Sequence, residues 1–183
     1  MIIETVMTSL NTEDKLNFSA IGVQFIKNNL LFYPYKNTIT AENILTTKKG
    51  VVNIVDRSYY LVLAALSEVD FAVHQTDLGN YYLENCCYYY EFELSKVSDL
   101  GEKYKITAKT AAKKSRNDFI GFNRADNLLL EAAVIASRIG ITKKAQDLKK
   151  FLAENKEIIF KTGDHKSKKS YLFLKEYSQR QEE

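Results

Sequence analysis

The chain has 183 residues, 45% of them hydrophobic and 27% charged, which suits one globular domain with room for a small appendage. No apolar run approaches the ~20 residues of a membrane helix, and no signal peptide precedes the first strand-like segment, so we expect a cytoplasmic protein that binds no membrane. The net charge of +3 arises at the end of the chain, where residues 141–183 hold 11 Lys and Arg against 7 Asp and Glu, an excess too small to indicate nucleic-acid binding.

Four segments in the first part of the chain are rich in β-branched and aromatic residues and are bounded by turn-forming ones. Each therefore predicts a strand. They are residues 2–10, 16–26, 29–35 and 51–55. In the second of them, Ser19, Ala20 and Gly22 are small and leave room above one face of the strand.

Two short helices are expected around the fourth strand. The first is capped by Thr38 or Thr40 and ends just before Gly50, which we expect in the left-handed conformation that follows a helix. The second covers residues 57–68, where apolar residues recur at helical spacing, and Asp56 is its expected cap.

Strict alternation marks two later segments, residues 86–94 and 104–112, in which one face carries aromatic or apolar side chains. The opposite faces carry glutamates in the first segment and lysines in the second. Glutamates facing lysines favour an antiparallel pair with one exposed face.

From residue 123 onward the apolar period becomes helical. Asn123 and Asp126 form a loose capping box for a first helix, and two more helices are expected over residues 142–155 and 164–177. The order of elements predicts an α+β protein with a barrel-like antiparallel sheet and helices packed on it.

The side chains offer little for covalent, acid–base or metal chemistry. The sequence contains no P-loop, no nucleophile elbow, no Gly-x-Gly-x-x-Gly and no His-Glu-x-x-His motif. His74 and His165 are far apart, and the adjacent Cys86 and Cys87 are interpreted as small half-buried residues, so we expect no metal site. If the protein is an enzyme, an organic cofactor is expected to supply its reactivity.

The start of the first helix is the stretch most typical of a binding site. Thr38, Thr40 and Asn43 place hydroxyl and amide groups where free backbone N–H groups and the helix dipole favour an anion such as phosphate. Lys36, just upstream, adds a positive charge. A helix that is merely well capped explains the same residues, and Glu42 in the first turn would repel a phosphate, so both interpretations stay open.

Four segments together resemble a known family. They are "IIETVMTSLNTEDKLNFSAIGVQF", "TITAENILTTKKGVVNIVD", "GFNRADNLLLEAAVIASRIGI" and the late "KTGD". Over nearly the whole chain they are similar to an uncharacterised, largely archaeal family whose members adopt the FMN-binding split barrel of the flavin-reductase-like superfamily. The resemblance implies FMN as cofactor, an antiparallel split β-barrel with short inserted helices over residues 1–122, and a C-terminal helical segment packed on the barrel over residues 123–183.

The resemblance also implies a position for each part of the flavin. In such barrels a Ser/Thr-x-Thr-x-x-Asn element holds the phosphate, which here corresponds to Thr38, Thr40 and Asn43. A basic residue before the element often assists, and here it is Lys36. The strand after the helix lines the site at Asn53. The isoalloxazine ring lies along the small-residue strand, here Ser19, Ala20, Ile21 and Gly22.

The chain departs from the family pattern at two places. The family tends to carry a proline where this chain has Ile21, and a second acid after Asp56 where this chain has Arg57. Asn123 and Arg124 are further candidate contacts, to the phosphate or to an anionic substrate. The alternative for Arg124 is an exposed position in the first turn of a helix.

The resemblance implies a homodimeric flavoprotein, an oxidoreductase that transfers hydride or electrons through FMN. Its electron donor would be a reduced nicotinamide or a reduced deazaflavin. Two other functions fit the sequence: a non-catalytic FMN-binding or carrier protein, and a cofactor-free scaffold that binds a partner through its basic helical end. The catalytic residues and the substrate are not defined by these patterns.

Overall fold

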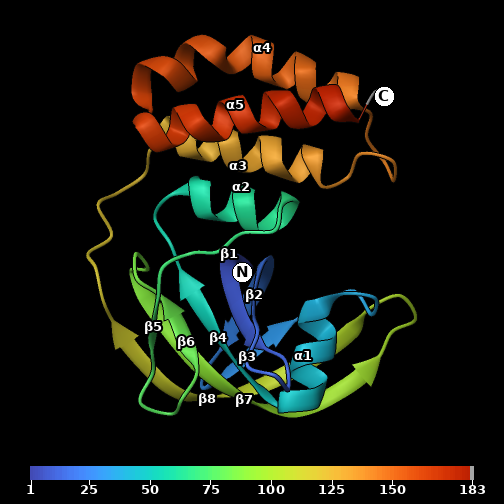
Figure 1. The fold of residues 1–183 in the computed structure, drawn as a ribbon, viewed down its shortest axis with the longest axis vertical. Helices are drawn as coiled ribbons and strands as arrows, with labels where there is room; N and C mark the ends of the chain where they lie inside the picture. The colour runs from blue at the N-terminus through green and yellow to red at the C-terminus, as the bar shows by residue number, and fades with distance from the viewer. Residues whose placement is uncertain (182–183) are drawn as a thin grey trace. The chain divides into compact units, whose positions relative to one another are not determined.

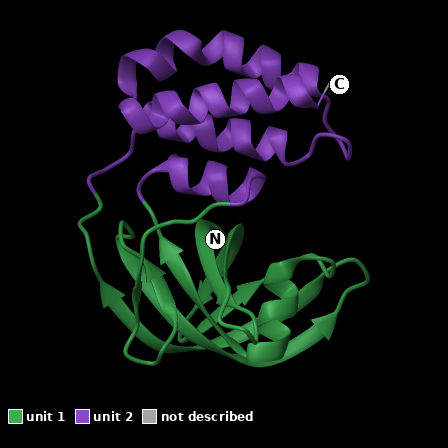
Figure 2. Ribbon diagram, in the orientation of Figure 1, with its two compact units in different colours: residues 1–55, 69–119 green, residues 56–68, 120–183 purple. Residues whose placement is uncertain are grey.

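A computed structural model describes residues 1–181, which form two compact units (Figures 1 and 2). The barrel unit consists of residues 1–55 and 69–119, and the helical unit consists of residues 56–68 and the chain from residue 120 onward. The expected boundary after residue 122 therefore lies close to the third crossing of the chain between the units, which follows residue 119. It misses residues 56–68, which were expected within the barrel segment and belong to the helical unit.

Six antiparallel strands close the barrel in the order β1-β2-β3-β8-β7-β4 (Figure 1). Their bounds are β1 Ile3–Leu10, β2 Leu16–Ile26, β3 Asn29–Phe32, β4 Lys49–Ile54, β7 Tyr88–Asp99 and β8 Tyr104–Ser115. Helix α1 (Ile39–Thr47) joins β3 to β4, and β5 (Val73–Gln75) pairs with β6 (Tyr81–Leu83) in a small separate sheet. The predicted antiparallel barrel with inserted helices is confirmed.

The barrel interior is filled by apolar side chains from all six strands and from α1. They are Met7, Val23, Leu30, Phe32, Ile44, Val52, Phe92, Ile106 and Ala108. Within this core the rings of Phe32 and Phe92 lie with their centroids 5.5 Å apart. The closed sheet and the helix thus enclose one continuous apolar core.

The end of α1 differs from the expectation at Gly50. The left-handed residue after the helix is Lys48, with φ 62°, and Gly50 is a buried residue of β4. A Cβ atom on Gly50 would come within 2.8 Å of Cζ of Phe92 and 3.2 Å of the carbonyl oxygen of Thr8. Glycine is needed here because an aromatic ring and a neighbouring strand approach its backbone closely.

The pairing of β7 with β8 confirms only part of the expected exposed face. Glu93 lies opposite Lys109, as the alternation predicts. Glu91 was expected on the same exposed face but is 1% exposed. Its carboxylate accepts hydrogen bonds from the Thr76 hydroxyl at 2.8 Å and from the Asn80 amide, because the turn between β5 and β6 lies against it.

The helical unit contains α2 (Ser58–Leu66), α3 (Arg124–Ala136), α4 (Ala145–Thr162) and α5 (His165–Arg180) (Figure 1). All four helices contribute to one apolar core. Its buried members include Val62, Leu129, Ala132, Leu148, Leu152, Ile159 and Leu174. The helices predicted from the second half of the chain are confirmed. Within residues 1–181, none of the helices has the length and apolarity to cross a membrane.

The caps of α2 and α3 are linked through one carboxylate. Asn123 caps α3, as predicted, and accepts hydrogen bonds from the backbone N–H groups of Ala125 and Asp126. The carboxylate of Asp126 instead accepts from the Ser58 backbone N–H at 3.0 Å and the Ser58 hydroxyl at 2.7 Å. The expectation that Asp56 caps α2 is therefore wrong: Arg57 holds the cap position without a side-chain bond, and Asp126 satisfies the first turn of α2.

Candidate functional site

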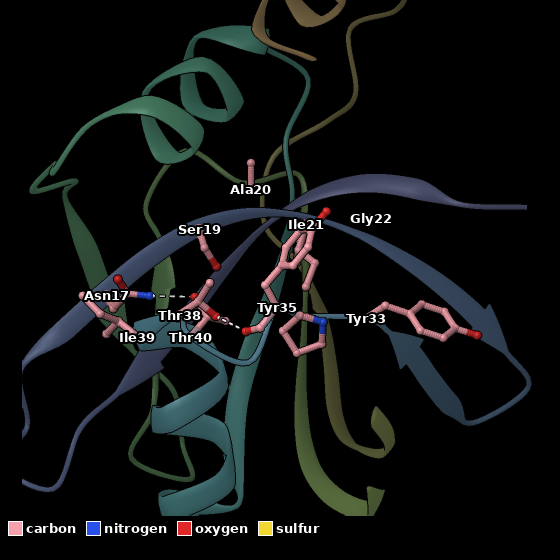
Figure 3. A pocket seen from close by; sticks show the side chains of 11 residues that line it. Asn17, Ser19, Ala20, Ile21, Gly22, Tyr33, Tyr35, Thr38, Ile39 and Thr40 are labelled. Carbon is pink, nitrogen blue, oxygen red and sulfur yellow. Dashed lines mark hydrogen bonds between the residues drawn. The ribbon is translucent and has the colours of Figure 1, made fainter. Parts of the chain in front are cut away.

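A cavity of about 450 Å³ opens beside the first turn of α1 (Figure 3). It is lined by β2, by the segment that follows β3 and by the start of α1. The lining residues are Asn17, Ser19, Ala20, Ile21, Gly22, Tyr33, Pro34, Tyr35, Thr38, Ile39 and Thr40. The volume falls in the range of ~300–1,000 Å³ that small-molecule sites occupy. We call it the α1 cavity.

Six of the residues singled out in the sequence lie on this cavity, although they come from separate segments of the chain. They are Ser19, Ala20, Ile21, Gly22, Thr38 and Thr40. The strand β2 supplies the first four and the start of α1 supplies the two threonines. The barrel topology thus brings the small-residue strand and the hydroxyl-rich helix start to one place.

Thr38 is the N-cap of α1, and its hydroxyl is fully used within the protein. It accepts a hydrogen bond from the backbone N–H of Ala41 at 3.3 Å and donates one to the carbonyl oxygen of Tyr35 at 2.7 Å. This hydroxyl holds the loop between β3 and the helix in place. The first turn of α1 therefore offers the cavity its backbone N–H groups rather than a free Thr38 hydroxyl.

Thr40 is 5% exposed, and its hydroxyl oxygen accepts a hydrogen bond from Nδ2 of Asn17 at 3.0 Å (Figure 3). A hydroxyl carries one proton of its own. Since the bond from Asn17 uses the oxygen as acceptor, the Thr40 proton stays available for an acceptor in the cavity. The first N–H groups of α1 also lack intrahelical partners, and together these donors favour an anion.

Asn17 was not among the residues singled out in the sequence. It lies on β2 two residues before Ser19, so the two side chains share a face of the strand. That spacing was the available signal, but the strand alone does not reveal that this face meets α1. Asn17 positions the Thr40 hydroxyl and is therefore part of the site.

Ser19 carries a buried polar atom with no protein partner. Within residues 1–181 its Oγ finds no hydrogen-bond partner, and Figure 3 shows this hydroxyl directed toward the part of the cavity where α1 begins. A buried hydroxyl left unpaired costs about 1–3 kcal/mol. A ligand with hydrogen-bond acceptors in the cavity would satisfy it.

Asn43 and Asn53, two further residues expected to contact the cofactor, are not among the residues that line the cavity. Asn43 is 2% exposed and donates to Oγ of Ser9 at 3.1 Å. Asn53 is fully buried: its amide donates to Oγ1 of Thr8 at 2.8 Å, and its oxygen accepts from the backbone N–H of Leu83 at 2.9 Å. Both amide side chains therefore form hydrogen bonds that join elements of the barrel unit.

Lys36 also lies outside the cavity lining. Its ammonium group pairs with the carboxylate of Asp99 at 2.5 Å and lies 5.3 Å from the centre of the Tyr104 ring. The hydrogen bond from Lys36 lowers the pKa of Asp99. This partner was not foreseen because β7 continues to Asp99, beyond the expected end of the strand near residue 94.

Asn123 and Arg124 belong to the helical unit, whereas the cavity is part of the barrel unit. The Asn123 side chain caps α3 and also donates to the carbonyl oxygen of Thr162 at 2.8 Å. Arg124 is an exposed residue in the first turn of α3, which is the alternative that the sequence left open. Glu42 is likewise exposed and does not line the α1 cavity.

Two family models match the chain. The model described as "Protein of unknown function (DUF447) N-terminal domain" matches residues 3–117, and the model described as "Protein of unknown function (DUF447)" matches residues 123–176. Among curated proteins, none matches the sequence.

Several solved structures have a similar fold. An FMN-bound protein from Methanosarcina mazei, described with the DUF447 family model, superposes with a TM-score of 0.80 at 19% identity, covering 96% of this chain and 94% of its own. Flavoredoxin from Methanosarcina acetivorans gives 0.53 at 19% identity, with 62% and 68% covered. A flavin reductase complexed with NADP+ gives 0.56 at 16% identity, with 67% and 83% covered. At these identities the likeness establishes the fold, and the predicted split barrel is confirmed.

Proposed function

This chain belongs to the DUF447 family, and we propose that it is an FMN-binding flavoprotein whose phosphate site is the first turn of α1. The observation that carries the proposal is the set of unsatisfied donors in the α1 cavity. The buried hydroxyl of Ser19, the proton of the Thr40 hydroxyl and the first backbone N–H groups of α1 all belong to this one cavity. The similar protein from Methanosarcina mazei is FMN-bound, which supports FMN as the ligand.

The donors fit a phosphate, which presents only acceptors when fully ionised. No carboxylate is among the residues that line the cavity, although the Glu4 carboxylate lies beside Gly22, one of those residues. Hydrogen bonds to a charged group contribute about 1.5–3 kcal/mol each. Thr40, Ser19 and the helix backbone would hold the phosphate, while Thr38 and Asn17 would hold these donors in place.

The unpaired edge of β2 is suited to binding a planar ring. Residues 23–26 of β2 pair with β3, whereas residues 16–22 pair with β1 alone among the described strands. The backbone along the second edge of Ser19–Gly22 therefore has no paired strand and can hydrogen-bond a heteroaromatic ring. The carbonyl oxygen of Ile21 already accepts one hydrogen bond, from the Thr5 hydroxyl at 2.8 Å. Ala20, Ile21 and Tyr35 offer apolar surface beside it. Ile21 keeps a backbone N–H at the position where the family tends to carry proline.

Bound FMN supplies hydride and electron transfer, and on this basis we extend the proposal to an oxidoreductase. A reduced nicotinamide is the first donor to test, because a flavin reductase of similar fold is complexed with NADP+; a reduced deazaflavin is the second. Anaerobic mixing of the FMN-loaded protein with NADPH or NADH, followed by flavin absorbance, separates an oxidoreductase from a carrier. Loss of the visible band supports turnover, whereas no change with either nicotinamide or a reduced deazaflavin supports a carrier.

A homodimer is part of the same proposal. Tyr35 and Ile39 line the cavity yet are 51% and 60% exposed, so two exposed hydrophobic side chains lie at the proposed flavin site. A second copy of the chain would cover this surface. Light scattering coupled to size-exclusion chromatography gives the mass in solution, and a monomer at micromolar concentration would contradict this part.

The substitution Thr40→Ala is expected to weaken FMN binding by about 5- to 150-fold, corresponding to 1–3 kcal/mol, because it removes one direct donor to the phosphate. The measurement is titration of FMN with protein, followed by quenching of flavin fluorescence. Thr47→Ala is the matched control, since Thr47 lies at the other end of α1 and donates to the carbonyl oxygen of Asn43. Equal affinity of Thr40→Ala and the wild type would show that the phosphate lies elsewhere.

A further inference from the structure

Four polar side chains form a hydrogen-bond network where β1, β2 and the start of α1 meet. They are Ser9 of β1, Asn17 of β2, and Thr40 and Asn43 of α1. Ser9, Thr40 and Asn43 are each more than nine-tenths buried. Asn17 and Thr40 line the α1 cavity, whereas Ser9 and Asn43 are not among its lining residues. We call these four residues the Ser9 network.

The Asn17 amide nitrogen is directed at two hydroxyl oxygens of this network. Its Nδ2 atom donates to Oγ1 of Thr40 at 3.0 Å and, over a longer 3.5 Å, to Oγ of Ser9. A side-chain amide has two N–H protons, and its oxygen can only accept. Because Nδ2 faces Thr40, the Thr40 oxygen is the acceptor within the protein and the hydroxyl keeps its proton for the cavity.

Asn43 holds the other end of the Ser9 network. Its Nδ2 atom donates to the same Ser9 oxygen at 3.1 Å. Asn43 thereby fixes the position of the Ser9 hydroxyl, and that hydroxyl in turn accepts from Nδ2 of Asn17. The orientation of the Asn17 amide therefore depends on two buried residues that do not line the cavity.

The opposite orientation of the Asn17 amide would change what the cavity recognises. The amide oxygen would then face Thr40 and accept its proton, and only the Thr40 oxygen would remain for a ligand. A fully ionised phosphate has no proton to donate to that oxygen, whereas the terminal hydroxyl of a ligand such as riboflavin can both donate and accept. The direction of one amide thus favours one of these two ligand groups over the other.

From these contacts we propose that Asn17 determines the specificity of the α1 cavity for an ionised phosphate over a neutral hydroxyl, and that Ser9 and Asn43 hold it in the required orientation. The inference rests on the proposed flavin function. Asn17 is a positioning residue, because it acts through Thr40. The bonds from Asn17 to Thr40 and from Thr40 to the phosphate run in one direction, so each polarises and strengthens the other. Asn43 thus serves the phosphate without lining the cavity.

The experiment measures the affinity of each variant for FMN and for riboflavin, by quenching of flavin fluorescence. The ratio of the two affinities is the readout, because a general loss of structure weakens both ligands alike. Asn17→Asp keeps the shape of the side chain but leaves it only acceptors. We expect this variant to lower the ratio about tenfold or more, with the affinity for riboflavin nearly unchanged.

Gln24→Glu is the matched control for the added charge. Gln24 lies on the same strand, outside the cavity lining. It is about 23 Å along the strand from Asn17, beyond the Debye length of about 8 Å at physiological salt, so the ratio should stay the same. An equal fall of the ratio in both variants would mean that general charge repulsion is responsible, which would overturn the proposal.

A double-mutant cycle tests whether Asn17 acts through Thr40. Asn17→Leu is neutral and of similar size, and it should lower the ratio about threefold or more. In the Thr40→Ala background the same change should leave the ratio unaltered, because the hydroxyl that Asn17 orients is absent. Equal effects in the two backgrounds would overturn the proposal, as would an unchanged ratio in the single variant.

Asn43→Ala and Ser9→Ala test the positioning role of the buried residues. Each should lower the ratio in the same direction as Asn17→Leu, and weakening of both flavins alike in both variants would overturn that role. The wild type separates this inference from the proposed function. A preference for FMN that persists in Asn17→Leu would overturn the role of Asn17 alone, whereas equal affinities of the wild type for the two flavins would contradict the phosphate site and this inference with it.

Discussion

The substitution Phe92→Ala is expected to lower the free energy of unfolding of the barrel unit by about 3–5 kcal/mol. Phe92 is fully buried, and its ring packs on Phe32 with centroids 5.5 Å apart and against Gly50. The surrounding strands form a closed barrel, so they cannot move inward to fill the space that the ring leaves. Both the lost apolar contact and the remaining cavity therefore destabilise the unit.

Urea unfolding measures this loss, and hydrogen exchange of individual peptides assigns it to the barrel unit. The control is Tyr88→Ala on the same strand, because Tyr88 is 37% exposed and its removal should cost less than about 1 kcal/mol. Equal effects of the two substitutions would contradict the assignment of Phe92 to the centre of the core.

The substitution Asp126→Ala is expected to destabilise the helical unit by about 2–4 kcal/mol. The carboxylate accepts two hydrogen bonds from Ser58 and pairs with Arg57 at 3.3 Å. Without it, the buried N–H and hydroxyl of Ser58 lose their acceptor, and Arg57 loses its partner. The Arg57 side chain is 26% exposed, so water compensates that loss in part and the Ser58 bonds account for most of the effect.

Asp126→Asn is the matched control, since an amide oxygen can still accept from Ser58 while the charge is removed. Its cost should be about 1 kcal/mol. Hydrogen exchange is expected to accelerate in α2 and α3 of Asp126→Ala, with the barrel strands unchanged. Faster exchange confined to α3 would contradict the role of Asp126 as the cap of α2.

Local signals in the sequence predicted most of the elements. Runs of β-branched and aromatic residues located β1 to β4, alternation located β7 and β8, and helical periodicity located α3, α4 and α5. Asn123 was identified as a cap because its own side chain satisfies the N–H groups of the next turn. Signals of this kind work because the interacting groups are only a few residues apart.

The predictions that failed depend on residues far apart in the chain. The partner of Asp126 is Ser58, 68 residues away, so the capping box suggested by spacing does not form. Glu91 is buried by Thr76 and Asn80 from the turn between β5 and β6. The assignment of residues 56–68 to the helical unit likewise depends on contacts with helices from the end of the chain.

In the candidate site, too, local signals identified the segments, whereas the contacts of individual side chains depend on residues far apart in the chain. Thr38 and Thr40 were equivalent in the sequence motif, yet only Thr40 keeps a proton for a ligand. That difference depends on Asn17, 23 residues away on β2. Asn43 belongs to the motif, but its amide donates a hydrogen bond to Ser9, 34 residues away, and so joins α1 to β1. The sequence thus indicated the two segments that meet at the α1 cavity, whereas the contacts of each side chain depend on the closed barrel.

Parallel titrations of the wild-type protein with FMN and with riboflavin test the phosphate site at α1 most directly. The two ligands share the ring and differ in the phosphate, so their difference in affinity isolates the contribution of the helix start, Thr40 and Ser19. FMN is expected to bind at least tenfold more tightly, a difference of about 1.4 kcal/mol or more. Equal affinities would contradict a phosphate site at α1, and the failure of both ligands to bind would contradict a flavoprotein.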